Sequence, residues 1–158
     1  MNSLILLVLL TLVPLIELRG ALPLALISAE SQNIPSLLIF FIIVSLNILL
    51  IFFVFFFLDN LHKSLLSYKL YKKFYGFYLK KAQKRIEKFE RAHNEIGIYA
   101  LFLFVAIPLP LTGAYSGAFI SWIMNLDRKK SIAAISAGVF TAGVLIYLGV
   151  QGVISFLS

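Results

Sequence analysis

Apolar residues fill four long runs of the chain, and one hydrophilic region separates the first two runs from the last two. The runs at 36–58 and 131–157 are continuous, and each is long enough to cross a bilayer as one tilted helix. Proline and glycine interrupt the runs at 4–29 and 96–126, which leaves apolar arms of about half a bilayer in length. The pattern therefore predicts an all-α integral membrane protein with two full spans and two broken segments.

The two interruptions are alike in sequence. Each reads Pro-Leu, a few residues and then Gly-Ala, as Pro14-Leu-Ile-Glu17-Leu-Arg19-Gly20-Ala21-Leu-Pro23 and as Pro108-Leu-Pro110-Leu-Thr112-Gly113-Ala114. Paired interruptions at corresponding places in two halves of a membrane protein point to a transporter's substrate site. The first interruption also holds two charged residues, which are costly at bilayer depth and therefore indicate a function.

Composition and charge agree with a membrane protein. The 158 residues are 61% hydrophobic and 13% charged, and the net charge is +7. Ten of the fourteen Lys and Arg residues lie between Lys63 and Arg91, and three more form the cluster 128–130. Basic residues in short segments beside membrane spans mark the cytoplasmic side, so we favour this explanation over nucleic-acid binding.

The hydrophilic region 59–95 is amphipathic, because its apolar residues recur at steps of three or four with Lys and Arg between them. We expect a basic helix, or two helices, lying on the inner membrane surface in contact with lipids. The alternative is a regulatory domain.

The charge clusters also predict the topology. If 96–126 crossed the membrane fully, the basic region and the cluster 128–130 would lie on opposite sides, against the positive-inside bias. We therefore predict that 96–126 is a re-entrant helical hairpin and, by analogy, that 4–29 enters from the outer face. A broken full-length helix has the same composition and stays open as an alternative.

The predicted fold is a single multi-pass domain, 1–158, in the cell membrane. It consists of two inverted repeats, each a re-entrant hairpin plus a transmembrane helix, joined by the basic cytoplasmic helix. The parts are the first repeat 1–58 (hairpin 4–29, span 36–58), the connector 59–95, and the second repeat 96–158 (hairpin 96–126, span 131–157).

The interruptions supply the candidate site. Prolines suit an unwound segment because they have no N–H to satisfy, and glycines permit close approach of another segment or a ligand. Thr112 is a candidate N-cap for the helix that follows it. Two tips meeting near the midplane would present helix N-termini to one shared cavity. The candidate substrate- or ion-binding residues are Glu17, Arg19, Gly20, Pro23, Pro108, Pro110, Thr112 and Gly113.

Glu17 and Arg19 have two interpretations. In the functional one, Arg19 binds an anion, because guanidinium holds phosphate or carboxylate in a bidentate manner, and Glu17 couples transport to protons. In the structural one, the two side chains form an ion pair that only stabilises the hairpin tip. Asn47 in the first span is expected to make an interhelical hydrogen bond. Weaker candidates for lining the second hairpin are Tyr115, Ser116, Ser121 and Trp122.

The chain has no cysteine and no serine–histidine–acid set, nucleotide-binding glycine loop or metal-ligand cluster. The sequence therefore offers no candidate catalytic residues, and we expect neither an enzyme nor a bound cofactor.

At its two interruptions the chain resembles the small multidrug export protein family of short prokaryotic membrane proteins. The resemblance rests on Pro14-x-x-Glu17-x-Arg19-Gly20-Ala21-x-Pro23 and on Ala106-Ile-Pro108-Leu-Pro110-Leu-Thr112-Gly113-Ala114, and it implies drug efflux. The predicted architecture is also similar to the DedA and VTT membrane proteins, whose implied role is moving polyprenyl-phosphate or other lipids between leaflets. This chain is shorter and lacks a clear second arginine at the Pro108 motif.

Three functions follow. The first is a proton- or ion-coupled secondary transporter with its site between the hairpin tips, favouring an anionic small molecule or a phosphate-headed lipid. The second is a cationic drug exporter of four full-span helices in which Glu17 binds the cation. The third is a non-transporting membrane scaffold. Since so small a chain has few helices with which to enclose a pathway, we expect a homodimer or a higher homo-oligomer.

Overall fold

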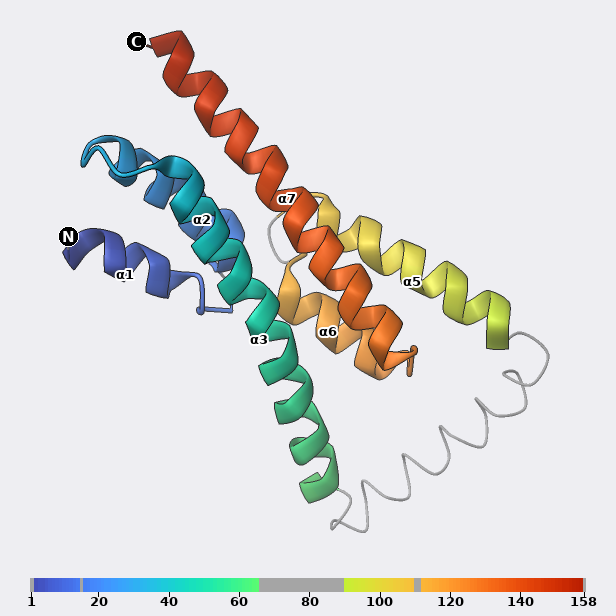
Figure 1. Cartoon of the computed structure of the whole chain (residues 1–158). Coiled ribbons are helices and arrows are strands. Elements are labelled where there is room, and N and C mark those ends of the chain that lie inside the picture. Colours follow the sequence, from blue (N-terminus) through green and yellow to red (C-terminus); the bar gives the residue numbers. More distant parts are fainter. Residues whose placement is uncertain (1, 15, 66–89, 110–111, 158) are drawn as a thin grey trace.

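The computed structural model describes residues 2–14, 16–65, 90–109 and 112–157, and the regular structure of that part is entirely helical (Figure 1). A helix suits the apolar runs because it satisfies the hydrogen bonds of its own backbone, as a segment crossing a bilayer would have to do. The helices are α1 (Asn2–Leu10), α2 (Glu17–Glu30), α3 (Ser36–Leu65), α5 (Glu90–Ala106), α6 (Ala114–Ile123) and α7 (Arg128–Leu157).

Helices α3 and α7 are the two long elements, and they pack against each other in opposite directions. At one end, the hydroxyl of Ser36 lies 3.2 Å from that of Tyr147 and accepts a hydrogen bond from Gln151 at 2.8 Å. At the other end, Arg128 forms an ion pair with Asp59. The start of α3 therefore lies beside the end of α7, and the end of α3 lies beside the start of α7.

Both long helices contain a stretch that is long and apolar enough to cross a membrane, at Ser36–Asn60 in α3 and at Arg128–Phe156 in α7. The prediction of two membrane-capable helices is confirmed at this level. Helix α3 continues beyond the predicted end at residue 58, to Leu65. Most of the predicted connector 59–95 falls at 66–89, which lies outside the described residues.

The first interrupted segment forms α1 and α2, which pack against each other. The break between them is shorter than predicted, because α2 begins at Glu17 and runs through Gly20 and Pro23. The expectation that the unwound stretch extends to Pro23 is therefore wrong. Proline in a helix leaves one carbonyl, here that of Arg19, without its usual partner, a loss that helices in membranes tolerate.

The second interrupted segment forms α5 and α6. Helix α5 begins, and helix α6 ends, near the start of α7. A Cβ on Gly97 of α5 would lie 2.8 Å from the side chain of Leu126, which follows α6. Near the other end of α5, the side chain of Val105 approaches both Gly117 of α6 and Gly138 of α7. The chain therefore runs along α7 to about its middle and then turns back, as Figure 1 also shows.

Both breaks lie near the middle of the long helices. Gly143 of α7 is surrounded by Phe40 and Val44 of α3 and by Leu18, the second residue of α2. At the end of α1, the hydroxyl of Thr11 accepts a hydrogen bond from the buried amide of Asn47. The expected hydrogen bond from Asn47 across to another segment is thus present, although its partner follows α1 and is not itself in a helix.

Candidate functional site

The side chain of Glu17, at the start of α2, links the first break to the second. Its carboxylate accepts hydrogen bonds from the backbone N–H groups of Ala114, at 3.1 Å, and Tyr115, at 3.0 Å. These are among the free N–H groups at the start of α6, where the helix dipole also favours negative charge. A side chain from 97 residues earlier in the chain therefore caps α6. Only 6% of Glu17 is exposed, so water does not compete for these bonds.

Arg19 binds the other end of the second break, where α5 ends. Its Nη2 donates hydrogen bonds to the carbonyl oxygens of Val105 at 2.8 Å, Thr112 at 2.9 Å and Ile107 at 3.2 Å. Val105 and Ile107 are at the end of α5, where helical carbonyls have no partner in their own helix. Its Nη1 lies 3.5 Å from the Oε2 atom of Glu17. The two charges therefore neutralise each other while each stabilises one helix end.

The backbone of Glu17 makes this arrangement possible. Glu17 has a φ of 44°, in the left-handed region that residues with a Cβ seldom adopt. Such a conformation costs on the order of 1–3 kcal/mol and is retained only where surrounding contacts hold it. It turns the first residue of α2 so that Glu17 and Arg19, two positions apart, reach the same cluster.

Gly113 leaves the space for the carboxylate. A Cβ at this position would lie 1.2 Å from Oε2 of Glu17 and 2.8 Å from Nη1 of Arg19. Every other residue type would therefore displace the ion pair. This steric requirement is a more specific role for Gly113 than the flexibility inferred from sequence.

Thr112 does not cap α6, which corrects the sequence-based expectation. The N-cap is Gly113, and no side chain of its own makes the cap. The Thr112 hydroxyl instead points back to the carbonyl oxygens of Leu109, at 2.8 Å, and Ile107, at 2.9 Å. The reason is that the carboxylate of Glu17 already occupies the N–H groups that Thr112 would have bound.

Tyr115 makes a second connection between the first break and the cluster of Glu17, Arg19, Thr112 and Gly113. Its phenol O–H donates to the carbonyl oxygen of Leu12 at 2.6 Å, while its backbone N–H binds Glu17. Sequence reasoning named Tyr115 only as a weaker candidate. The carbonyl groups that Arg19 and Tyr115 bind give no sequence signal, because every residue carries one.

The remaining candidates lie apart from this cluster. Pro108 is exposed in the second break, and Gly20 and Pro23 lie within α2. Pro110 lies outside the described residues. The structure therefore brings together four of the eight predicted residues, Glu17, Arg19, Thr112 and Gly113.

No group of His, Cys, Asp or Glu suited to holding a metal ion occurs in the described part of the chain. The site is instead an ion pair whose two members each bind backbone groups of another segment.

The two long apolar helices, together with the charged junction that Glu17 and Arg19 form with the second break, suggest a small helical membrane protein. The chain matches the sequence model of the small multi-drug export protein family over residues 17–145, a range that begins at Glu17 and includes the second break, all of α3 and more than half of α7. It belongs to that family, whose name suggests export across a membrane. No curated protein and no solved structure matches the chain significantly.

Proposed function

We infer that the chain is a secondary transporter of the cell membrane that moves an anionic amphiphile through the junction of the two breaks. The pairs α1–α2 and α5–α6 are re-entrant hairpins in two inverted repeats, and the connector 59–95 lies on the cytoplasmic side. Transport is coupled to protons through Glu17, and the working unit is a homodimer or a higher homo-oligomer. The observation that carries this proposal is the binding of the Glu17 carboxylate to the N-terminus of α6.

The position of the junction supports a midplane site. The contacts of Leu18 with Gly143 put the start of α2 near the middle of α7, the point farthest from both membrane surfaces if α7 spans a bilayer. The proximity of Gly97 to Leu126 supports the hairpin over a full span, because a full span would separate these residues by the bilayer thickness. A hairpin also keeps the cluster 128–130 on the same side as the connector.

The bonds of Glu17 and Arg19 support an anionic substrate. The carboxylate already occupies an anion site, with two N–H donors and a guanidinium beside it. The buried Nε atom of Arg19 has no hydrogen-bond partner among the described residues, so one donor is left for a substrate oxygen. A cationic substrate, by contrast, would meet a carboxylate whose charge Arg19 has already balanced.

The same bonds support proton coupling. A protonated Glu17 carries no charge to hold the α6 N-terminus, so it would leave the N–H groups of Ala114 and Tyr115 free for a substrate phosphate or carboxylate. Substrate and proton would then bind together, and the release of both would allow Glu17 to cap α6 again.

The test is an uptake assay in proteoliposomes with an imposed proton gradient. It compares a fluorescent anionic amphiphile with a cationic dye, in the wild type, in Glu17→Gln and in Glu30→Gln. Glu30 is the matched control, because it lies exposed at the other end of α2. We expect proton-dependent movement of the anion in the wild type and in Glu30→Gln, and loss of proton dependence in Glu17→Gln.

Two results would overturn the proposal. Proton-dependent movement of the cationic dye alone would support the alternative cation exporter. If neither compound moves, a scaffold becomes the better explanation, and neutralising the lysines of the connector should then abolish the cellular phenotype while Glu17→Gln preserves it.

A further inference from the structure

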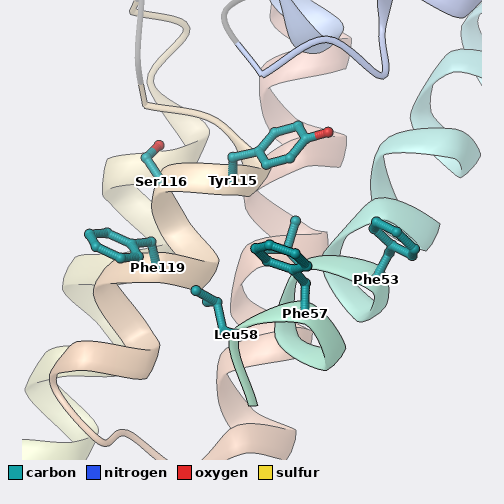
Figure 2. A pocket seen from close by; sticks show the side chains of 7 residues that line it. Phe53, Phe57, Leu58, Tyr115, Ser116 and Phe119 are labelled. Carbon is teal, nitrogen blue, oxygen red and sulfur yellow. The ribbon is translucent and has the colours of Figure 1, made fainter. Parts of the chain in front are cut away.

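A pocket of about 500 Å³ lies between α3 and α6, beside the charged junction. This volume is within the range of small-molecule sites. The pocket is lined by Phe53, Phe57 and Leu58 of α3 and by Tyr115, Ser116 and Phe119 of α6 (Figure 2). Phe53 and Phe57 are 66% and 57% exposed, so the pocket is open to the outside of the molecule.

The pocket suits an apolar group. Its hydroxyl groups already have partners within the protein, since Tyr115 donates to the carbonyl of Leu12 and Ser116 donates to that of Gly113 at 3.2 Å. A polar ligand group placed among the phenylalanines would lose its hydrogen bonds to water without gaining others. A hydrocarbon tail would lose nothing.

Cationic side chains are found at both ends of the pocket. Tyr115 joins one end to Glu17 and Arg19 through its backbone N–H. At the other end, Leu58 is followed by Asp59, which binds Arg128. Lys129 and Lys130 are exposed next to Arg128.

The acidic residues at the Arg128 end do not fully balance the basic ones, since Arg128, Lys129 and Lys130 carry three positive charges and Asp59 and Asp127 carry two negative charges. Asp59 binds Arg128 and also accepts a hydrogen bond from Trp122 at 3.3 Å. Asp127 accepts one from the backbone N–H of Lys130 at 2.9 Å. An anionic headgroup at this end of the pocket would therefore meet a net positive charge.

We propose that this pocket binds the hydrocarbon tail of an anionic single-tailed amphiphile taken from the surrounding lipid, with its headgroup at Arg128–Lys130. The proposal rests on the proposed function and names the substrate class of that transporter. Tyr115 belongs to both sites, because its ring lines the pocket while its N–H binds Glu17. The tail of the occupant then lies next to the helix end that Glu17 releases, and the headgroup would move from Arg128–Lys130 to this helix end in the transport step.

Trp122, the single tryptophan of the chain, provides the readout. It lies on α6 one turn beyond Phe119, and its indole N–H binds Asp59 beside the pocket. A bromine-labelled tail in the pocket should quench its fluorescence. The experiment titrates the full-length protein in lipid nanodiscs with brominated dodecyl phosphate and, separately, with brominated dodecylphosphocholine, which has the same tail and no net charge.

We expect half-maximal quenching at about tenfold lower mole fraction for the phosphate than for the phosphocholine, a modest difference in binding strength. The double variant Phe53→Ala/Phe57→Ala should lose this site, with about tenfold weaker quenching by the phosphate. Phe52→Ala/Phe56→Ala is the matched control, since those rings are 52% and 63% exposed on the same helix and do not line the pocket. Its quenching should equal that of the wild type.

Two further variants sharpen the result. Ser116→Leu should fill the pocket and reduce quenching without removing any phenylalanine. Lys129→Gln/Lys130→Gln should leave the phosphocholine curve unchanged and move the phosphate curve toward it. Equal quenching by the two probes in the wild type would overturn the proposal, as would equal effects of the two phenylalanine double variants.

The two proposals fail separately in this design. If the phosphate quenches as expected but is not transported in proteoliposomes, the pocket stands and the transport function fails. If transport depends on Glu17 but quenching does not depend on Phe53 and Phe57, the transport function stands and the tail site is wrong.

Discussion

The two helix breaks are similar in sequence but contribute different chemistry to their junction. The first break supplies charged side chains, Glu17 and Arg19. The second supplies backbone groups, with N–H donors from the start of α6 and carbonyl acceptors from the end of α5 and from Thr112. Each side chain binds the helix end whose partial charge is opposite to its own. Most bonds of the junction therefore join side chains of the first half to backbone of the second, and the Tyr115 hydroxyl adds one bond in the opposite sense, to the Leu12 carbonyl.

This difference explains why the second break needs no arginine of its own. Its contribution is the geometry of a helix end, and its critical residue is Gly113, where the absence of a side chain admits the carboxylate. A sequence comparison of the two motifs would treat the missing charge as a loss. In the structure it is the condition under which the first break can bind the second.

The largest effect should come from Gly113→Ala. The new methyl group would overlap the Glu17 carboxylate, so the carboxylate must move from the start of α6 and away from Arg19, and we expect a loss of about 4 kcal/mol in the free energy of unfolding. Gly149→Ala on α7 is the matched control, because a Cβ there meets nothing within 4 Å. Unfolding in mixed micelles, followed by circular dichroism, measures both variants. Equal stability of the two variants would contradict the observed closeness of Gly113 and Glu17.

Much of this fold could be predicted from the sequence, but the junction could not. Continuous apolar runs are enough to indicate α3 and α7, and proline with glycine marks the two breaks. The end of the first break was missed because Pro23 forbids only one hydrogen bond and α2 continues through it. The bonds from Arg19 to three carbonyl groups had no pattern to reveal them, since a carbonyl is common to all residues.

Arg19→Ala should have the next largest effect. It removes three hydrogen bonds to the end of α5 and leaves the Glu17 carboxylate buried without its counter-charge, so we expect a loss of about 3 kcal/mol in stability. Arg19→Lys should recover only part of it, because an ammonium group cannot reproduce the planar guanidinium fork. The same unfolding experiment tests both. Full recovery by lysine would mean that charge alone, and not the carbonyl contacts, holds the second break.

Glu17→Gln should have a smaller effect, and it would show whether the start of α6 and the end of α5 are stabilised independently. One amide oxygen can still accept from the start of α6, but the NH₂ group then faces a backbone N–H, so we expect a loss of about 2 kcal/mol. Amide hydrogen exchange should rise at Ala114 and Tyr115 and change little along α5, which Arg19 still holds. Equal rises on both helices would show that the ion pair acts as one unit. A double-mutant cycle with Arg19→Ala gives the energy of that coupling.

Thr112→Val should have the smallest effect, and it tests the claim that the second break acts through its backbone. The Thr112 hydroxyl has one proton to share between the carbonyl groups of Ile107 and Leu109, and Arg19 also donates to the former. The backbone carbonyl of Thr112, which binds Arg19, is present in every variant. We therefore expect a loss of about 0.5–1 kcal/mol for Thr112→Val and less for Thr112→Ser, which keeps a hydroxyl. A loss as large as that of Arg19→Ala would instead make this side chain an essential part of the junction and give the second break a chemistry closer to that of the first.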